Sequence, residues 1–65
     1  MKDQETFGSK EDAFANAKKR SENNVELAYI VVMTQAWEVW ELKMEEEIPP
    51  YCIALFINGG KVMLT

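Results

Sequence analysis

Apolar residues follow two different spacings along the chain, and the change falls near Asn24. Between residues 9 and 22 they recur three or four positions apart, as on one side of a helix. Ala13, Phe14 and Ala17 share that side, whereas Ala15 lies opposite. Ser9 is a suitable N-cap, followed by acidic residues, and basic residues come toward the end. The pattern predicts a helix over residues 9–22 with a narrow apolar stripe.

Beyond Val25 the pattern becomes typical of strands. Residues 27–33 are almost entirely apolar and rich in β-branched side chains. Residues 36–44 contain two tryptophans and a valine within four positions, which favours a second strand. The segment 35–47 also contains good helix formers, so a helix there is the alternative.

Consecutive prolines at 49–50 interrupt the second half of the chain. The seven apolar residues 51–57 follow, and they predict a strand buried on both faces. Asn58-Gly59 is a two-residue hairpin signal, with 61–64 as the returning strand. The sequence thus predicts one α+β domain over residues 1–65. Its N-terminal helix would pack on an antiparallel sheet of three to four strands, a meander ending in a C-terminal hairpin.

The strands at 27–33 and 51–57 are apolar at both odd and even positions, so both sheet faces need a cover. The narrow helix covers only one. A chain of this size also buries too little surface to hold a large stability margin. We therefore expect a homo-oligomer, most simply a dimer, in which a second copy covers the other face. The alternative is that the N-terminal segment around Phe7 folds over it.

Charge and composition narrow the class of protein. Residues 1–24 are electrically neutral, whereas residues 25–65 carry two positive and six negative side chains, which is the whole net charge of −4. An acidic surface disfavours nucleic acid, and no apolar run reaches the ~20 residues of a membrane span. The polar N-terminus does not resemble a signal peptide, so we expect a cytoplasmic protein.

Few residues are suited to catalysis. There is no histidine, and the single cysteine, Cys52, stands among apolar residues, where a buried hydrophobic role is the simplest reading. Glu45-Glu46-Glu47 is best read as a solvated turn rather than a metal site. We expect no enzyme activity, no catalytic residue, no metal and no cofactor.

The candidate binding residues combine aromatic and acidic side chains, as interface hot spots often do. We expect a small interaction protein that binds, and thereby inhibits, another protein whose identity the sequence does not give. A version of this hypothesis is a mimic of nucleic-acid phosphates, whose binding would weaken steeply with salt. The candidate residues are Trp37, Glu38, Trp40, Glu41 and Tyr51.

Two other classes stay open. The first is a small-molecule-binding module whose pocket lies between two protomers, with one of three consecutive basic residues contacting an anionic ligand. The second is a structural subunit of a larger assembly. The pocket would be lined by Tyr29, Trp37, Trp40 and Tyr51, with Lys18, Lys19 or Arg20 beside it.

Overall fold

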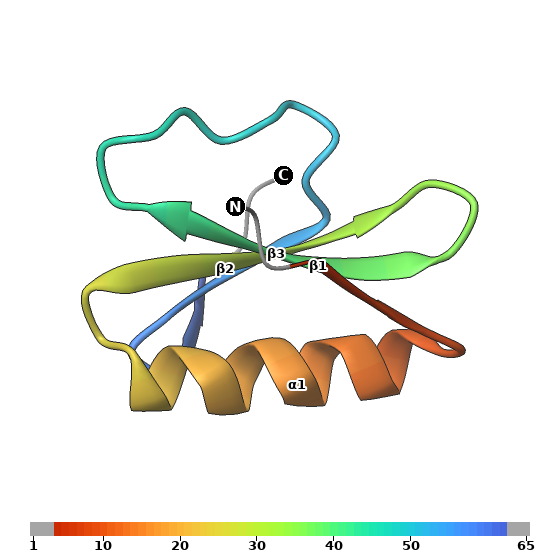
Figure 1. Cartoon of the computed structure of the whole chain (residues 1–65), viewed down its shortest axis with the longest axis horizontal. Coiled ribbons are helices and arrows are strands. Elements are labelled where there is room, and N and C mark those ends of the chain that lie inside the picture. The colour runs from red at the N-terminus through yellow and green to blue at the C-terminus, as the bar shows by residue number, and fades with distance from the viewer. Residues whose placement is uncertain (1–3, 63–65) are drawn as a thin grey trace.

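The chain forms one helix packed on a five-stranded antiparallel sheet in the computed structural model, which describes residues 4–62 (Figure 1). The sheet order is β1-β3-β2-β4-β5, so β3 lies between β1 and β2. The predicted α+β class is confirmed, but the sheet has five strands rather than three to four. The predicted meander is wrong, because β4 pairs with β2 rather than with β3, the strand that precedes it in the chain. The elements are β1 (Gln4–Phe7), α1 (Lys10–Asn23), β2 (Leu27–Met33), β3 (Trp37–Lys43), β4 (Ala54–Ile57) and β5 (Gly60–Val62).

Helix α1 forms where the apolar spacing predicts it. The Asp12 N–H donates to Ser9 Oγ at 3.2 Å, so Ser9 is the N-cap. Ala13 and Ala17 are buried against the sheet, and Ala15 is exposed, as the spacing predicts. The small side chains of this stripe bring the helix close to the sheet.

Strands β2 and β3 form a hairpin, which confirms both predicted strands and shows the helix alternative for 35–47 to be wrong. The strands pair from Leu27 with Lys43 to Met33 with Trp37, so the turn is three residues long. Seven paired positions and the burial of Val39 and β2 side chains outweigh the local helix propensity.

The C-terminal hairpin also forms as predicted, with a two-residue turn between Ile57 and Gly60. Asn58 and Gly59 have φ angles of 52° and 78°, the left-handed values that such turns require. The Gly59 N–H donates to Ser21 Oγ at 2.8 Å, which attaches the turn to α1. A Cβ at Gly59 would lie 2.5 Å from Glu22 Cγ, so glycine also fits the space.

Two strand boundaries differ from the prediction. Strand β4 begins at Ala54, whereas the prediction began at Tyr51. Residues 51–53 instead end the segment after β3, because the Cys52 N–H donates to the Pro49 carbonyl at 3.1 Å and turns the chain. Strand β5 covers 60–62, and the rest of the predicted strand at 61–64 lies outside the described residues.

Strand β1 is the element that the sequence pattern missed. It is four residues long and pairs with β3, Phe7 opposite Trp37. Phe7 is its one large apolar side chain, too little for a periodic signal. Phe7 packs against the core on the helix side of the sheet. The alternative in which this segment covers the other face is therefore wrong.

The sheet has an apolar core on each face, as the apolar residues at both odd and even positions of β2 predict. Tyr29 and Val31 face the helix, whereas Ile30 and Val32 face away from it. The helix-side core consists of Ala13, Ala17, Tyr29, Val31, Val39, Ala54 and Phe56. The far-side core consists of Ala28, Ile30, Val32, Leu42 and Leu55.

The far-side core is buried within one chain. Residues 44–53, here called the connection, arch over that face between β3 and β4 (Figure 1). Cys52 packs against the core there, and Ile30 and Val32 are 0% exposed. The apolar far face therefore gives no reason for a second copy, and homo-oligomerisation stays a prediction without that argument.

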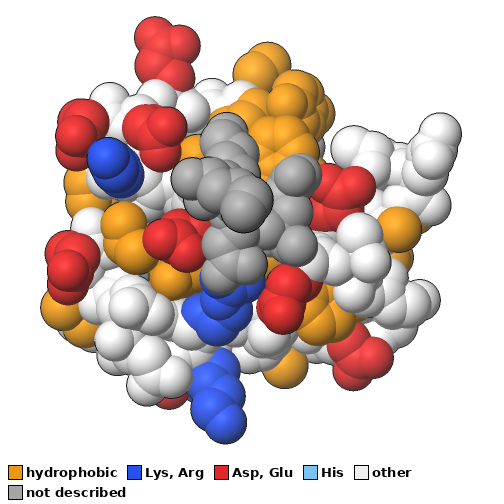
Figure 2. All heavy atoms as spheres, viewed as in Figure 1, with side chains coloured by type: hydrophobic (Ala, Val, Ile, Leu, Met, Phe, Trp, Pro, Cys, Tyr) orange, Lys and Arg blue, Asp and Glu red, His pale blue; other side chains and the backbone are white. Residues whose placement is uncertain are grey.

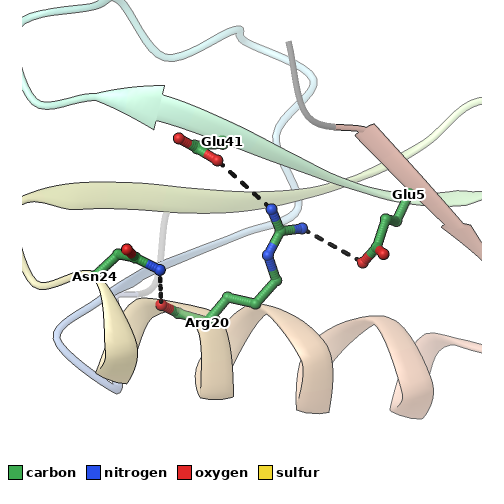
Figure 3. Close-up of polar contacts among 4 residues, drawn as sticks. All are labelled: Glu5, Arg20, Asn24 and Glu41. Carbon is green, nitrogen blue, oxygen red and sulfur yellow. Dashed lines mark hydrogen bonds and ion pairs between the residues drawn. The ribbon is translucent and has the colours of Figure 1, made fainter.

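Arg20 connects the helix to three strands, and Figure 3 shows its contacts with two of them, β1 and β3. Its guanidinium lies 4.8 Å from the Tyr29 ring centroid in β2. One terminal nitrogen contacts Glu5 of β1 at 3.4 Å, and the other contacts Glu41 of β3 at 3.5 Å. The basic run at 18–20, expected to lie at the helix end or beside an anionic ligand, thus supplies a structural contact through Arg20.

Substituting Arg20 tests this contact. We expect Arg20→Met to lower the free energy of unfolding by about 1–2 kcal/mol, since methionine retains the packing of the stem but not the cation. Lys19→Met, at an exposed site of the same helix, is the control and should change it by less than about 0.5 kcal/mol. Urea unfolding measures both, and equal values would show that Arg20 contributes only surface charge.

Candidate protein-binding surface

The connection has a defined shape although it contains no regular helix or strand. At its start, the Lys43 N–H donates to Glu46 Oε1 at 2.7 Å and the Glu46 N–H donates to the Lys43 carbonyl at 3.0 Å. At its end, the Ile53 N–H donates to the Val31 carbonyl at 2.8 Å, which continues the pairing of β2 and β4. Two prolines restrict the middle. The segment is thus held in place before any partner binds.

The connection carries large apolar side chains that point into solvent. Met44 is 47% exposed, Ile48 40% and Tyr51 55%. Figure 2 shows hydrophobic side chains gathered at the top of the molecule, over the face that the connection crosses. Clustered exposed apolar groups are more informative than scattered ones, because water disfavours them unless a contact compensates. We call Glu38, Trp40, Met44, Ile48 and Tyr51 the connection surface.

Trp40 joins the sheet to the connection. Its ring and the Tyr51 ring meet edge to face, with centroids 6.0 Å apart and planes at 81°. Its indole Nε1–H donates to Glu38 Oε1 at 2.8 Å, and Thr34 Oγ1–H donates to Glu38 Oε2 at 2.8 Å. The aromatic pair and the carboxylate are therefore fixed relative to one another.

These hydrogen bonds favour the ionised form of Glu38. The bond from Trp40, and then that from Thr34, holds the pKa of Glu38 below its ordinary value of 4.5. A carboxylate whose pKa is lower in the folded chain stabilises the fold above the pKa of the unfolded chain. That contribution is lost as the pH falls through the folded pKa.

We therefore expect the free energy of unfolding to depend on pH through the ionisation of Glu38. Between neutral pH and pH 3, the native chain should lose more unfolding free energy than the Glu38→Gln variant, whose amide oxygen still accepts hydrogen bonds but does not titrate. Urea unfolding at several pH values measures the difference. Glu47→Gln, at an exposed position of the connection, is the matched control. Parallel profiles for the native chain and Glu38→Gln would contradict the assignment.

The structure brings together three of the five predicted binding residues. Glu38, Trp40 and Tyr51 lie on the connection side of the sheet. Trp37 packs in the helix-side core, and Glu41 contacts Arg20 there. Alternation along β3 separates them, so a single patch of all five does not form.

The same alternation divides the residues expected to line an interface pocket. Tyr29 is buried on the helix side under Arg20, together with Trp37. Trp40 and Tyr51 lie on the opposite side. These four aromatic residues therefore do not line one pocket.

Sequence reasoning missed two members of the connection surface and one supporting residue. Ile48 stands between Glu47 and Pro49, outside any periodic segment, which is a signal for an exposed apolar residue. Met44 gives no comparable signal. Thr34 is four residues from Glu38, and only the folded hairpin brings its hydroxyl to the carboxylate. The solvated character predicted for 45–47 agrees with their exposure.

Cys52 is half-buried beside the far-side core rather than buried in a strand. Its thiol donates to the Ala54 carbonyl at 3.1 Å, and burial is the main cause of a raised pKa, so the thiol stays protonated at neutral pH. Within residues 4–62, no three Cys, Asp or Glu side chains come together as a metal site. No helix in that range has the length and apolar character to cross a bilayer.

No protein-family model, no curated protein and no solved structure matches this chain, so its own geometry is the basis for a functional proposal.

Proposed function

We propose that the chain is a small non-enzymatic interaction protein that binds another protein through the connection surface and inhibits it by covering the site it occupies. The observation that carries the proposal is the concentration of exposed apolar side chains on a segment that is already ordered. Ordering before binding reduces the entropy lost on association. The segment therefore has both the contact area and the rigidity of a recognition loop.

The charge around the connection surface indicates the chemistry of the partner. Glu45, Glu46 and Glu47 are exposed in the connection, and Glu38 lies on the same side of the sheet. Complementary charge steers association and sets orientation. The proposed partner therefore presents an apolar groove for Ile48 and Tyr51, with arginine or lysine at its rim.

The version of the hypothesis in which carboxylates imitate nucleic-acid phosphates has less support. Glu38 and Glu41 face opposite sides of the sheet and do not form a row that resembles a phosphate backbone. The proposal accordingly depends on the apolar and aromatic residues, with charge as the orienting contribution.

Site-specific photo-crosslinking tests this proposal in the cells that produce the chain. We expect p-benzoylphenylalanine at position 51 to give one discrete adduct, and the same group at position 15, on the outer face of α1, to give none. Excess native chain should compete the adduct away, whereas the Tyr51→Ala variant should not. With the purified partner, calorimetry should show at least about tenfold weaker binding for Tyr51→Ala.

Two outcomes would overturn the proposal. One is an adduct of twice the mass of the chain, which would make the surface a contact between two copies. The other is equal labelling from positions 15 and 51, which would indicate unspecific collision.

A further inference from the structure

The turn between β4 and β5 places a nucleophile next to an electrophile. Asn58 is exposed, and Gly59 follows it without a side chain to shield its backbone nitrogen. Asparagine is among the thermally labile residues. Before glycine its side-chain carbonyl carbon, Cγ, is open to attack by the next backbone nitrogen, because the five-membered ring that forms has little strain. The two residues whose left-handed φ angles make the turn are therefore also a reactive pair.

The reaction converts an amide into an acid. The Gly59 nitrogen forms a bond to Asn58 Cγ while the bond from Cγ to Nδ2 breaks, and ammonia leaves with the proton of the Gly59 N–H. The product is a cyclic succinimide. Water then opens the ring at either carbonyl and gives aspartate or isoaspartate, in which the backbone runs through the side chain. The chain gains one water, loses one ammonia and acquires one negative charge.

The folded chain holds this nitrogen in a different contact. The Gly59 N–H donates to Ser21 Oγ at 2.8 Å, and Ser21 is 0% exposed. The Ser21 hydroxyl donates its own hydrogen to the Lys18 carbonyl at 2.8 Å, so it meets Gly59 as an acceptor. Cyclisation requires the nitrogen to lose its proton and turn toward Asn58 Cγ. The hydrogen bond opposes both steps, because it directs the N–H toward the helix and away from solvent.

We propose that Asn58 is a deamidation site and that the Ser21 hydroxyl controls its rate. The reactive state is a local opening in which the turn leaves α1 while the rest of the fold persists. The turn is attached to α1, on the opposite side of the sheet from the connection, so this inference does not depend on the proposed function (Figure 1).

The products fit the closed turn less well than asparagine does. Glu22 lies beside the turn, with its Oε2 3.1 Å from where a Cβ on Gly59 would stand. A new carboxylate at position 58 therefore adds repulsion at this end of α1. Isoaspartate lengthens the backbone by one carbon, which conflicts with a two-residue turn between Ile57 and Gly60. Modification thus favours the detached state from which it arises.

Timed incubation of the intact chain at neutral pH tests the proposal. Trypsin releases the peptide 44–61, in which Asn58 is the only carboxamide side chain. Deamidation raises the mass of this peptide by about one dalton. We expect the folded chain to react at least about tenfold more slowly than the chain unfolded in urea, since only the open fraction reacts. Asn58→Gly, which suits the same turn, is the control and should show no mass gain.

Two variants separate local opening from global unfolding. Ser21→Ala removes the acceptor of the Gly59 N–H and should speed deamidation at least about fivefold. Ile30→Val weakens the far-side core but leaves this contact in place, so it should change the rate less than about twofold. A native rate for Ser21→Ala, equal acceleration by both variants, or equal rates in the folded and urea-unfolded chain would overturn the proposal.

Hydrogen exchange on the native chain provides a test that does not depend on whether Ser21→Ala folds. As the temperature rises, the deamidation rate should increase in proportion to exchange of the Gly59 N–H, which reports opening of the turn. Proportionality to exchange of the Ile30 N–H in β2 instead would show that global unfolding controls the reaction, and the role of Ser21 would be wrong.

Discussion

Replacing Ile30 with alanine should lower the free energy of unfolding by about 3–4 kcal/mol, within the range for truncation of a fully buried isoleucine. Ile30 is 0% exposed and lies in the far-side core, away from the helix. Its burial comes from the same chain, so the loss should not depend on protein concentration. Urea unfolding at two concentrations a hundredfold apart measures both the size and this independence.

Ile30→Val is the graded control and should cost about 1 kcal/mol, because it removes one methylene and leaves a smaller cavity. A stability that rises with concentration for the native chain would show that association contributes to burial of this face. A loss below about 1 kcal/mol for Ile30→Ala would show that the connection covers the core only loosely.

Phe56→Ala should lower the free energy of unfolding by about 3–5 kcal/mol, at least as much as Ile30→Ala. Phe56 is 3% exposed, belongs to the helix-side core and meets Phe14 edge to face with centroids 5.7 Å apart. Its removal leaves a cavity between helix and sheet that the small residues Ala13 and Ala17 cannot fill. Thermal unfolding followed by circular dichroism should show a much lower midpoint, or no cooperative transition.

Phe56→Leu is the matched variant for this position. It retains most of the buried volume but loses the aromatic pair, so a cost of about 1–2 kcal/mol is expected. Equal effects of leucine and alanine would indicate that the ring contact with Phe14, rather than filled volume, determines the stability of this core.

Local patterns predicted most of the fold because each predicted element carries its own signal. The apolar stripe and N-cap mark α1, continuous β-branched residues mark β2, and Asn58-Gly59 marks the last turn. Strand β1 gives no such signal. It exists because β3 offers it an open edge and because Phe7 finds a place against the helix-side core, and both conditions are tertiary.

The candidate site was predictable only in part, because it too depends on tertiary contacts that local patterns do not reveal. Composition singled out Trp40 and Tyr51, and alternation correctly placed the two tryptophans on opposite faces once the segment was a strand. The prediction was wrong about which part of the protein covers the far face of the sheet. A segment with two prolines and three glutamates reads as a plain turn, yet its Cys52 packs on that core.

The position of β1 in the sheet has a consequence for the order of assembly. Strand β1 precedes the other described elements along the chain, but within residues 4–62 it pairs with β3 alone, which follows about 30 residues later. The β2–β3 hairpin closes over a three-residue turn and so costs far less chain entropy. Strand β1 is therefore made before the strand with which it pairs, and the nascent chain must emerge past Lys43 before β1 can join the sheet.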